Sequence, residues 1–187
     1  GRIPKIIMLK NHGIFVSGDS AEEIRSLYAG VMEPLRAEYD ALGVNEDLGI
    51  GDAGQDPQTE FAIRDIFGED AQFIKSSGFF ECVPGPITPD HLVYARAYPF
   101  SDELTRENAD AYRAKHGFAP KVVIHGDRIY GLGVTEKNAG LALLFAQDGA
   151  QVLKLSQAFG GVEYMTDRAR EFIENWEVES YREKVAS

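Results

Sequence analysis

The residues of this chain with the clearest capacity for chemistry are its four histidines, at positions 12, 91, 116 and 125. No two of them are spaced as an H-x-H pair, an H-E-x-x-H helix or a Cys/His zinc motif, so the sequence predicts no self-contained metal site. A P-loop and a serine nucleophile elbow are also absent from the sequence, and Gly131-Leu132-Gly133 lacks the third glycine of a dinucleotide fingerprint. Each histidine must therefore be judged by its own surroundings.

His12 lies in the stretch MLKNHGIFVSGD, residues 8–19, directly after an apolar run that predicts a buried strand. Asn11 and Gly13 flank it, and Gly13 supplies the backbone freedom to aim the ring. Strand ends in α/β sheets are common places for ligands. Two interpretations stay open: His12 is a ligand or catalytic group presented at a strand end, or it is an ordinary turn histidine.

His91 closes a second candidate segment, GPITPDH, residues 85–91. Thr88 as cap, Pro89 at the first helical position and Asp90 in the first turn together predict a helix N-terminus. An imidazolium is disfavoured there, so we expect His91 to be neutral, as a ligand, a base or a hydrogen-bonded core residue. His116 is better explained as a cation at a helix C-terminus, and His125 ends a β-run.

The sequence contains an internal echo between residues 4–28 and residues 120–143. Pro4-Lys5 corresponds to Pro120-Lys121, and Ser20 corresponds to Thr135. Each copy predicts a buried strand, a tight turn, a second short strand, a glycine and a capped helix. The second copy is one residue shorter and has no histidine at the position of His12, which favours a chemical rather than a structural role for His12.

Other patterns predict further elements and an α/β fold, a mixed sheet with flanking helices. The helix after Ser20 should bury one stripe and be kinked or split by Pro34. The stripe consists of Ile24, Leu27, Tyr28, Val31, Leu35 and Leu42. We expect helices over 57–67, from 101 to 116 and over 136–159, strands at 73–74 and 79–83, and one or two amphipathic helices over 166–187 around Phe172, Ile173, Trp176 and Tyr181. Residues 1–48, 49–119 and 120–187 should form three parts of one compact unit.

Composition narrows the classes of partner. With 30 acidic and 19 basic residues the net charge is −11, and no Lys/Arg cluster offsets it, which argues against nucleic acid and anionic membranes. The apolar runs are far shorter than the ~20 residues of a membrane span. The single cysteine, Cys82, sits in the apolar stretch FFECVPG, where its thiol pKa should be raised. We expect a cytoplasmic protein without a secretory leader, an internal disulfide or a cysteine nucleophile.

Several segments resemble class II sugar-phosphate aldolases and the related adducin head domain. They are KNHGIFVSGDSAEEI, GPITPDH, the PKVVI…GLG segment and AFGGVEYMTDRAREFIENWEVESYR. Together they are most similar to the long form that precedes a short-chain dehydrogenase in bifunctional rhamnulose-phosphate aldolase/dehydrogenase-like proteins. The last segment matches more loosely, with Glu174-Asn175-Trp176 where the family has an acidic residue followed by Tyr-Trp, and the chain contains no dehydrogenase part.

The resemblance implies a metal-dependent lyase. By it, His12 is one of three histidines that hold a divalent metal, usually zinc, while an H-x-H pair and a proton-handling glutamate lie upstream. The metal would stabilise the enediolate formed in retro-aldol cleavage of a ketose phosphate. Asn11, Gly13, Asp90 and His91 become candidate substrate-binding residues.

Only eleven residues precede His12. We therefore expect the carboxy-terminal piece of a class II aldolase-like three-layer fold, inactive and metal-free alone. Its expected partners are the missing upstream segment and a sugar-phosphate substrate, and a homo-oligomer is compatible with the resemblance. The alternative is a non-catalytic, adducin-like assembly domain.

Overall fold

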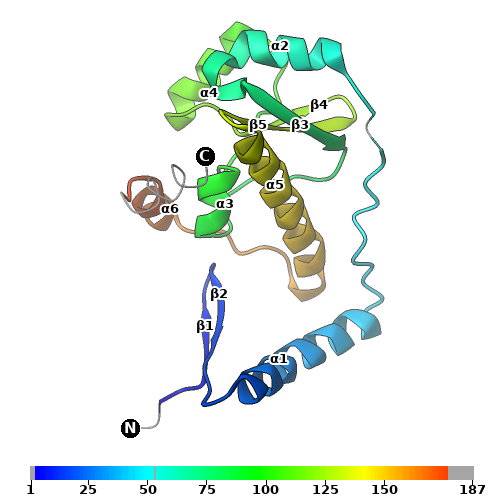
Figure 1. Cartoon of the computed structure of the whole chain (residues 1–187), viewed down its shortest axis with the longest axis vertical. Helices are drawn as coiled ribbons and strands as arrows, with labels where there is room; N and C mark the ends of the chain where they lie inside the picture. The colour runs from blue at the N-terminus through cyan, green and yellow to red at the C-terminus, as the bar shows by residue number, and fades with distance from the viewer. Residues whose placement is uncertain (1–2, 53, 177–187) are drawn as a thin grey trace.

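The structure, a computed structural model, describes residues 3–52 and 54–176. It confirms an α/β protein, with small antiparallel sheets and flanking helices (Figure 1). The elements follow in the order β1 (Ile6–Leu9), β2 (Gly13–Val16), α1 (Ala21–Ala41), α2 (Pro57–Phe67), the 3₁₀ turn η1 (Gly68–Ala71), β3 (Phe73–Gly78), α3 (Pro89–Tyr94), α4 (Arg106–His116), β4 (Val122–His125), β5 (Arg128–Gly133), α5 (Glu136–Ser156), the 3₁₀ turn η2 (Gln157–Phe159) and α6 (Asp167–Glu174).

The main sheet has the order β3-β5-β4, with all pairs antiparallel and β5 in the centre. Because successive side chains point to opposite faces, β5 contributes to two cores. Tyr130 and Leu132 pack with residues of α2 and α4 on one face. Ile129 packs with Ala146 of α5 on the other. The sheet is therefore covered by helices on both faces.

α5 approaches the sheet unusually closely, and glycines on β5 permit it. A Cβ on Gly131 would lie 2.5 Å from the Ala139 carbonyl oxygen, and one on Gly133 would lie 2.4 Å from the Ala139 nitrogen. The Gly-Leu-Gly segment that resembled an incomplete dinucleotide fingerprint thus serves helix-on-sheet packing in this fold.

Helix caps occur where the sequence predicts them. Ser20, Asp56, Thr88 and Thr135 each accept a hydrogen bond from the backbone amide three residues later. The last helix of the second copy, α5, runs into η2 and stops at Gly160, whose φ of 93° is left-handed.

Two of the predicted elements are wrong in detail. Residues 79–83 are not a strand; the chain leaves the sheet after Gly78, and Phe80 is buried in the core beneath α5. α4 begins at Arg106, capped by Thr105, rather than at Ser101, because several cap-forming residues lie close together there. α1 continues through Pro34 as one helix, so of the two outcomes expected at Pro34 the split is excluded.

The predicted tail helices are only partly within the described residues. α6 covers Asp167–Glu174, with Phe172 exposed on its surface. Tyr181 and the rest of the tail after Trp176 lie outside the described residues.

The two echoing segments contain the same elements in the same order: an antiparallel hairpin followed by an N-capped helix. The strands pair Leu9 with Gly13 in the first hairpin and His125 with Arg128 in the second. The residue missing from the second copy is therefore in the turn between the strands.

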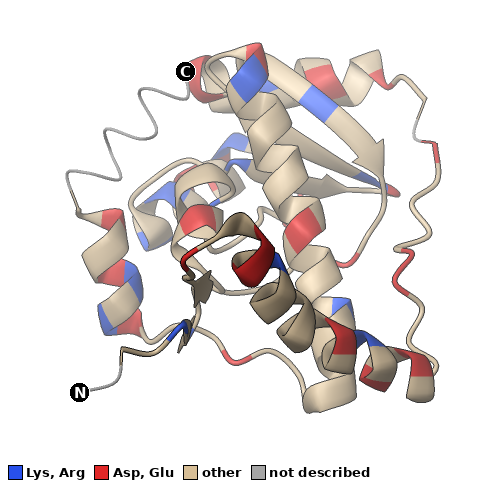
Figure 2. Ribbon diagram, turned by 60° about the horizontal axis from the view of Figure 1, so that its bottom comes forward, with Lys and Arg blue, Asp and Glu red and all other residues tan. Residues whose placement is uncertain are grey.

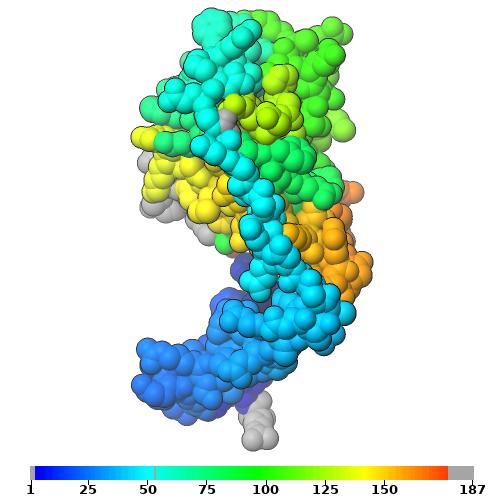
Figure 3. All heavy atoms as spheres, turned by 90° about the vertical axis from the view of Figure 1, so that its right-hand side faces the viewer, coloured from blue at the N-terminus to red at the C-terminus, as the bar shows by residue number. Residues whose placement is uncertain are grey.

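The packing of the two units differs, and the buried stripe predicted for α1 is wrong. α5 buries Ala139, Ala142 and Ala146, whereas α1 has no buried residue. Tyr28 and Leu42 of the expected stripe are 46% and 52% exposed, because no described element lies over that face. The hairpin β1-β2 and α1, which we call the N-terminal unit (residues 6–41), project away from the main sheet (Figures 1 and 3). The described residues that join them to α2, 42–52 and 54–56, contain no helix or strand.

None of the described helices combines the length and the apolar composition needed to cross a membrane.

Candidate functional site

His12 lies at the exposed tip of the first hairpin. The turn is set by residues with left-handed backbone, Asn11 at φ 55° and Gly13 at φ 140°. The His12 amide donates to the Leu9 carbonyl at 3.2 Å. Its ring stacks beside Phe15 with a centroid distance of 6.4 Å. The predicted exposed position of His12 at a strand end is confirmed, and its backbone is held by the turn.

The hairpin tip is anchored to the segment that follows η2. The Asn11 side-chain amide donates to the Glu163 carbonyl at 2.6 Å, and the Lys10 ammonium pairs with the Glu163 carboxylate. These contacts use the two residues before His12 and leave the imidazole exposed. The turn therefore presents the ring outward.

The described residues do not by themselves fit a zinc ion. Catalytic zinc takes about three protein ligands and keeps a further position open. No group of three or more His, Cys, Asp or Glu side chains that could hold a metal is found in the described part of the chain. His12 could supply one ligand, so no chemical step through a metal is derived from these residues.

His91 is the second candidate, and it lies in a different environment. Its side chain is only 8% exposed, in α3, which packs against α5 and α6. The Thr88 hydroxyl lies 2.7 Å from His91 Nδ1 and also accepts from the His91 amide. Nε2 lies 3.2 Å from Asp148 Oδ2 on α5, at angles that do not make a hydrogen bond. A hydroxyl that donates to Nδ1 leaves the ring proton on Nε2, facing Asp148.

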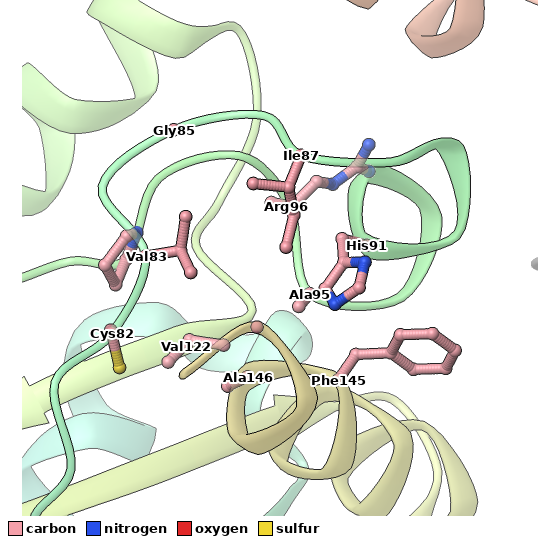
Figure 4. A pocket seen from close by; sticks show the side chains of 12 residues that line it. Cys82, Val83, Gly85, Ile87, His91, Ala95, Arg96, Val122, Phe145 and Ala146 are labelled. Atoms are coloured by element: carbon pink, nitrogen blue, oxygen red, sulfur yellow. The ribbon is translucent and has the colours of Figure 1, made fainter. Parts of the chain in front are cut away.

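His91 also borders a small apolar pocket between α3, α5 and the loop before α3 (Figure 4). The rings of Phe145 and His91 meet edge to face, with a centroid distance of 5.3 Å. Cys82 lies on the other side of the pocket (Figure 4). The cavity volume is only about 30 Å³, a tenth of the roughly 300 Å³ at which small-molecule sites begin.

The order hydroxyl, imidazole, carboxylate resembles an acid–base relay, but the pocket leaves no room for a substrate. The Thr88 hydroxyl is also engaged as the helix cap. We therefore interpret Thr88, His91 and Asp148 as a polar cluster that fixes α3 to α5. Asp90, in the first turn of α3, is partly buried. The candidate residues at the hairpin tip contact Glu163, whereas His91 in α3 contacts Asp148. The two groups of candidates therefore have different neighbours.

Burial lowers the pKa of His91, although Asp148 and Asp90 oppose the shift. The neutral state expected from the sequence is thus supported, with burial rather than the helix dipole as its main cause. The unfolded chain then takes up a proton at higher pH than the folded protein does. Stability should accordingly fall as the pH falls below about 6.5, the ordinary histidine pKa, toward the lower folded value.

We predict that His91→Gln makes the free energy of unfolding less dependent on pH between about 7.5 and 5, the range in which histidine titrates. Urea unfolding at several pH values measures this slope. His125→Gln is the matched control, because His125 is exposed at a strand end. Equal slopes for the wild type and His91→Gln would contradict the assignment.

Two other sequence expectations concern Cys82 and His116. Burial raises the pKa of the Cys82 thiol to about 12, as its apolar setting predicted. His116 ends α4 as expected, and burial, with the nearby Lys115 and Arg170, lowers its pKa, which opposes the cationic state expected for it. Sequence reasoning missed Asp148, which faces His91, and Arg170, which lies near His116, because each is far from that histidine along the chain.

Comparison with protein-family models, with curated proteins and with solved structures finds no significant match for this chain.

Proposed function

We propose that this chain is the carboxy-terminal part of a class II aldolase-like protein, in which His12 is one ligand of a zinc ion or another divalent metal. In the intact protein the activity would be retro-aldol cleavage of a ketose phosphate. The observation that supports this most is the exposed His12 imidazole on a hairpin tip whose backbone is set by Asn11 and Gly13. A ligand that must join others from outside the chain needs such an outward, preorganised position.

The uncovered apolar surface of the N-terminal unit supports a second part of the proposal, the upstream segment. On the hairpin, Ile7 and Phe15 lie opposite each other in the strand register and are 45% and 56% exposed. Ile24 and Tyr28 of α1, one helical turn apart, are exposed as well. Exposed apolar patches of this kind mark interaction sites. A segment that covered it would lie beside His12 and could bring the remaining metal ligands.

The same surface is the observation that favours the alternative, a non-catalytic, adducin-like assembly domain. In that case the apolar face would bind another protein, and His12 would be only a turn residue. The upstream sequence distinguishes the two: an H-x-H pair and a glutamate favour the lyase, and their absence favours assembly.

The proposal is tested by comparing the 187-residue chain with a chain extended upstream in the parent protein. Both are assayed with zinc for release of an aldehyde and dihydroxyacetone phosphate from a ketose 1-phosphate. We expect activity from the extended chain alone, because the described residues offer one metal ligand. Activity of equal size in the shorter chain, or none in an extended chain that binds zinc, would contradict the proposal.

A further inference from the structure

A groove of about 680 Å³ lies between the end of α4, the loop before it and α6. This volume is within the range of about 300–1,000 Å³ that small-molecule sites occupy. Lys115 and His116 line it from the last turn of α4, Arg170 from α6, and Tyr98 and Asp102 from the loop. None of these residues belongs to the hairpin tip or to the pocket beside His91.

The imidazole of His116 is held rigidly within this groove. It lies against Tyr98 with a centroid distance of 4.7 Å and against Tyr112 at 4.4 Å. The Tyr112 hydroxyl donates to the backbone carbonyl of Tyr98, which fixes the Tyr112 side chain to the loop that carries Tyr98. A donor held in this way loses little entropy when it binds a ligand.

Acidic and basic residues are spread over the helices and the sheet of this protein, whose net charge is −11 (Figure 2). At the groove, Arg170 is paired with three carboxylates, those of Glu174 at 2.5 Å, Glu171 at 3.4 Å and Asp167 at 3.7 Å. Lys115 is exposed and has no ion pair within the described ranges. Lys115 and Arg170 both lie near enough to His116 to lower its pKa, after burial. Asp102 is the carboxylate that lines the groove.

We propose that this groove binds the phosphoryl group of a small phosphorylated molecule, with Lys115 and His116 as its ligands. A lysine is an effective point charge for phosphate, and a protonated imidazole adds a charge-assisted hydrogen bond. Tyr98 forms an apolar wall for the rest of the ligand. The proposed ligands all lie among the described residues, and none depends on an upstream segment.

The first test follows the four histidine ring signals of the 187-residue protein by proton NMR, with inorganic phosphate as the probe. Potassium chloride of equal ionic strength is the reference. A bound anion favours the imidazolium, so phosphate should raise the His116 pKa by about half a unit or more. The exposed His12 and His125 should behave alike in both salts. A His116 titration that is the same in phosphate and chloride would overturn the proposal.

The second test uses sulfate, whose own charge is constant where histidine titrates. Its binding should strengthen as the pH falls, because protonation of His116 adds positive charge. Lys115→Gln should weaken sulfate binding by about tenfold or more, because one hydrogen bond to a charged group is worth about 1.5–3 kcal/mol. Lys137→Gln, an exposed lysine on α5, is the matched control. Equal affinity of the two variants, with both melting as the wild type does, would overturn the proposal.

Discussion

Gly131→Ala should destabilise the protein by about 3 kcal/mol, the upper part of the usual range for overpacking. The new methyl group would lie 2.5 Å from the Ala139 carbonyl oxygen and 2.7 Å from the Leu143 nitrogen. Both obstacles are backbone atoms of α5, so no side-chain rotation relieves the contact. The helix would have to move off the central strand, which also loosens Ile129 and Ala146 in the core on that face. The measurement is the free energy of unfolding in urea.

Gly140→Ala is the matched control for this substitution. Gly140 lies within α5, and a Cβ there would meet nothing within 4 Å. Alanine in a helix interior is favoured over glycine, so this variant should gain about 0.5–1 kcal/mol. If Gly131→Ala were as stable as the wild type, the close approach of α5 to β5 would be contradicted.

Local chemistry made some of the fold predictable from sequence. The caps at Ser20, Asp56 and Thr88 depend on a side chain and an amide three residues later, and all three are observed. The order of elements in the two hairpin-helix units was predictable in the same way. An apolar stripe on a helix predicts burial, but the local sequence does not show which element covers it. The stripe on α1 was therefore expected to be buried, although it is exposed. The apolar run at 79–83 gave the wrong element because burial in a core does not require a strand partner.

The candidate residues were predictable to different extents. The position of His12 in an exposed turn followed from its glycine and the preceding apolar run. The neutral state of His91 was predicted from its place in the first turn of a helix. Its contact with Asp148 was not, because that contact joins two helices far apart in sequence. The groove at His116 was missed for the same reason: Arg170 comes from α6.

His12→Ala in a chain that includes the upstream segment should reduce zinc-dependent retro-aldol turnover by more than about a hundredfold. Loss of groups that only support a metal ligand already costs about 10–100-fold, and loss of a ligand should cost more. The fold should tolerate the change, because the His12 side chain is exposed and the turn is set by Asn11 and Gly13. Turnover of a ketose 1-phosphate, with the melting temperature as a check on folding, measures the effect.

His125→Ala is the control for this variant, since His125 is an exposed histidine beside the turn of the second hairpin. It should leave turnover unchanged. If both variants kept wild-type activity, His12 would be only a turn residue and not a metal ligand.

The most direct measurement of the role of His12 is a zinc titration against a competing chromogenic chelator. It uses the 187-residue chain, the extended chain and the extended His12→Ala variant. We predict one tightly bound zinc ion in the extended chain and none in the other two, since zinc requires roughly three protein ligands. The 187-residue chain offers one histidine, and His12→Ala leaves the extended chain with the upstream pair alone. Tight zinc binding by the extended His12→Ala variant, equal to that of its parent, would contradict the assignment of His12 as a metal ligand.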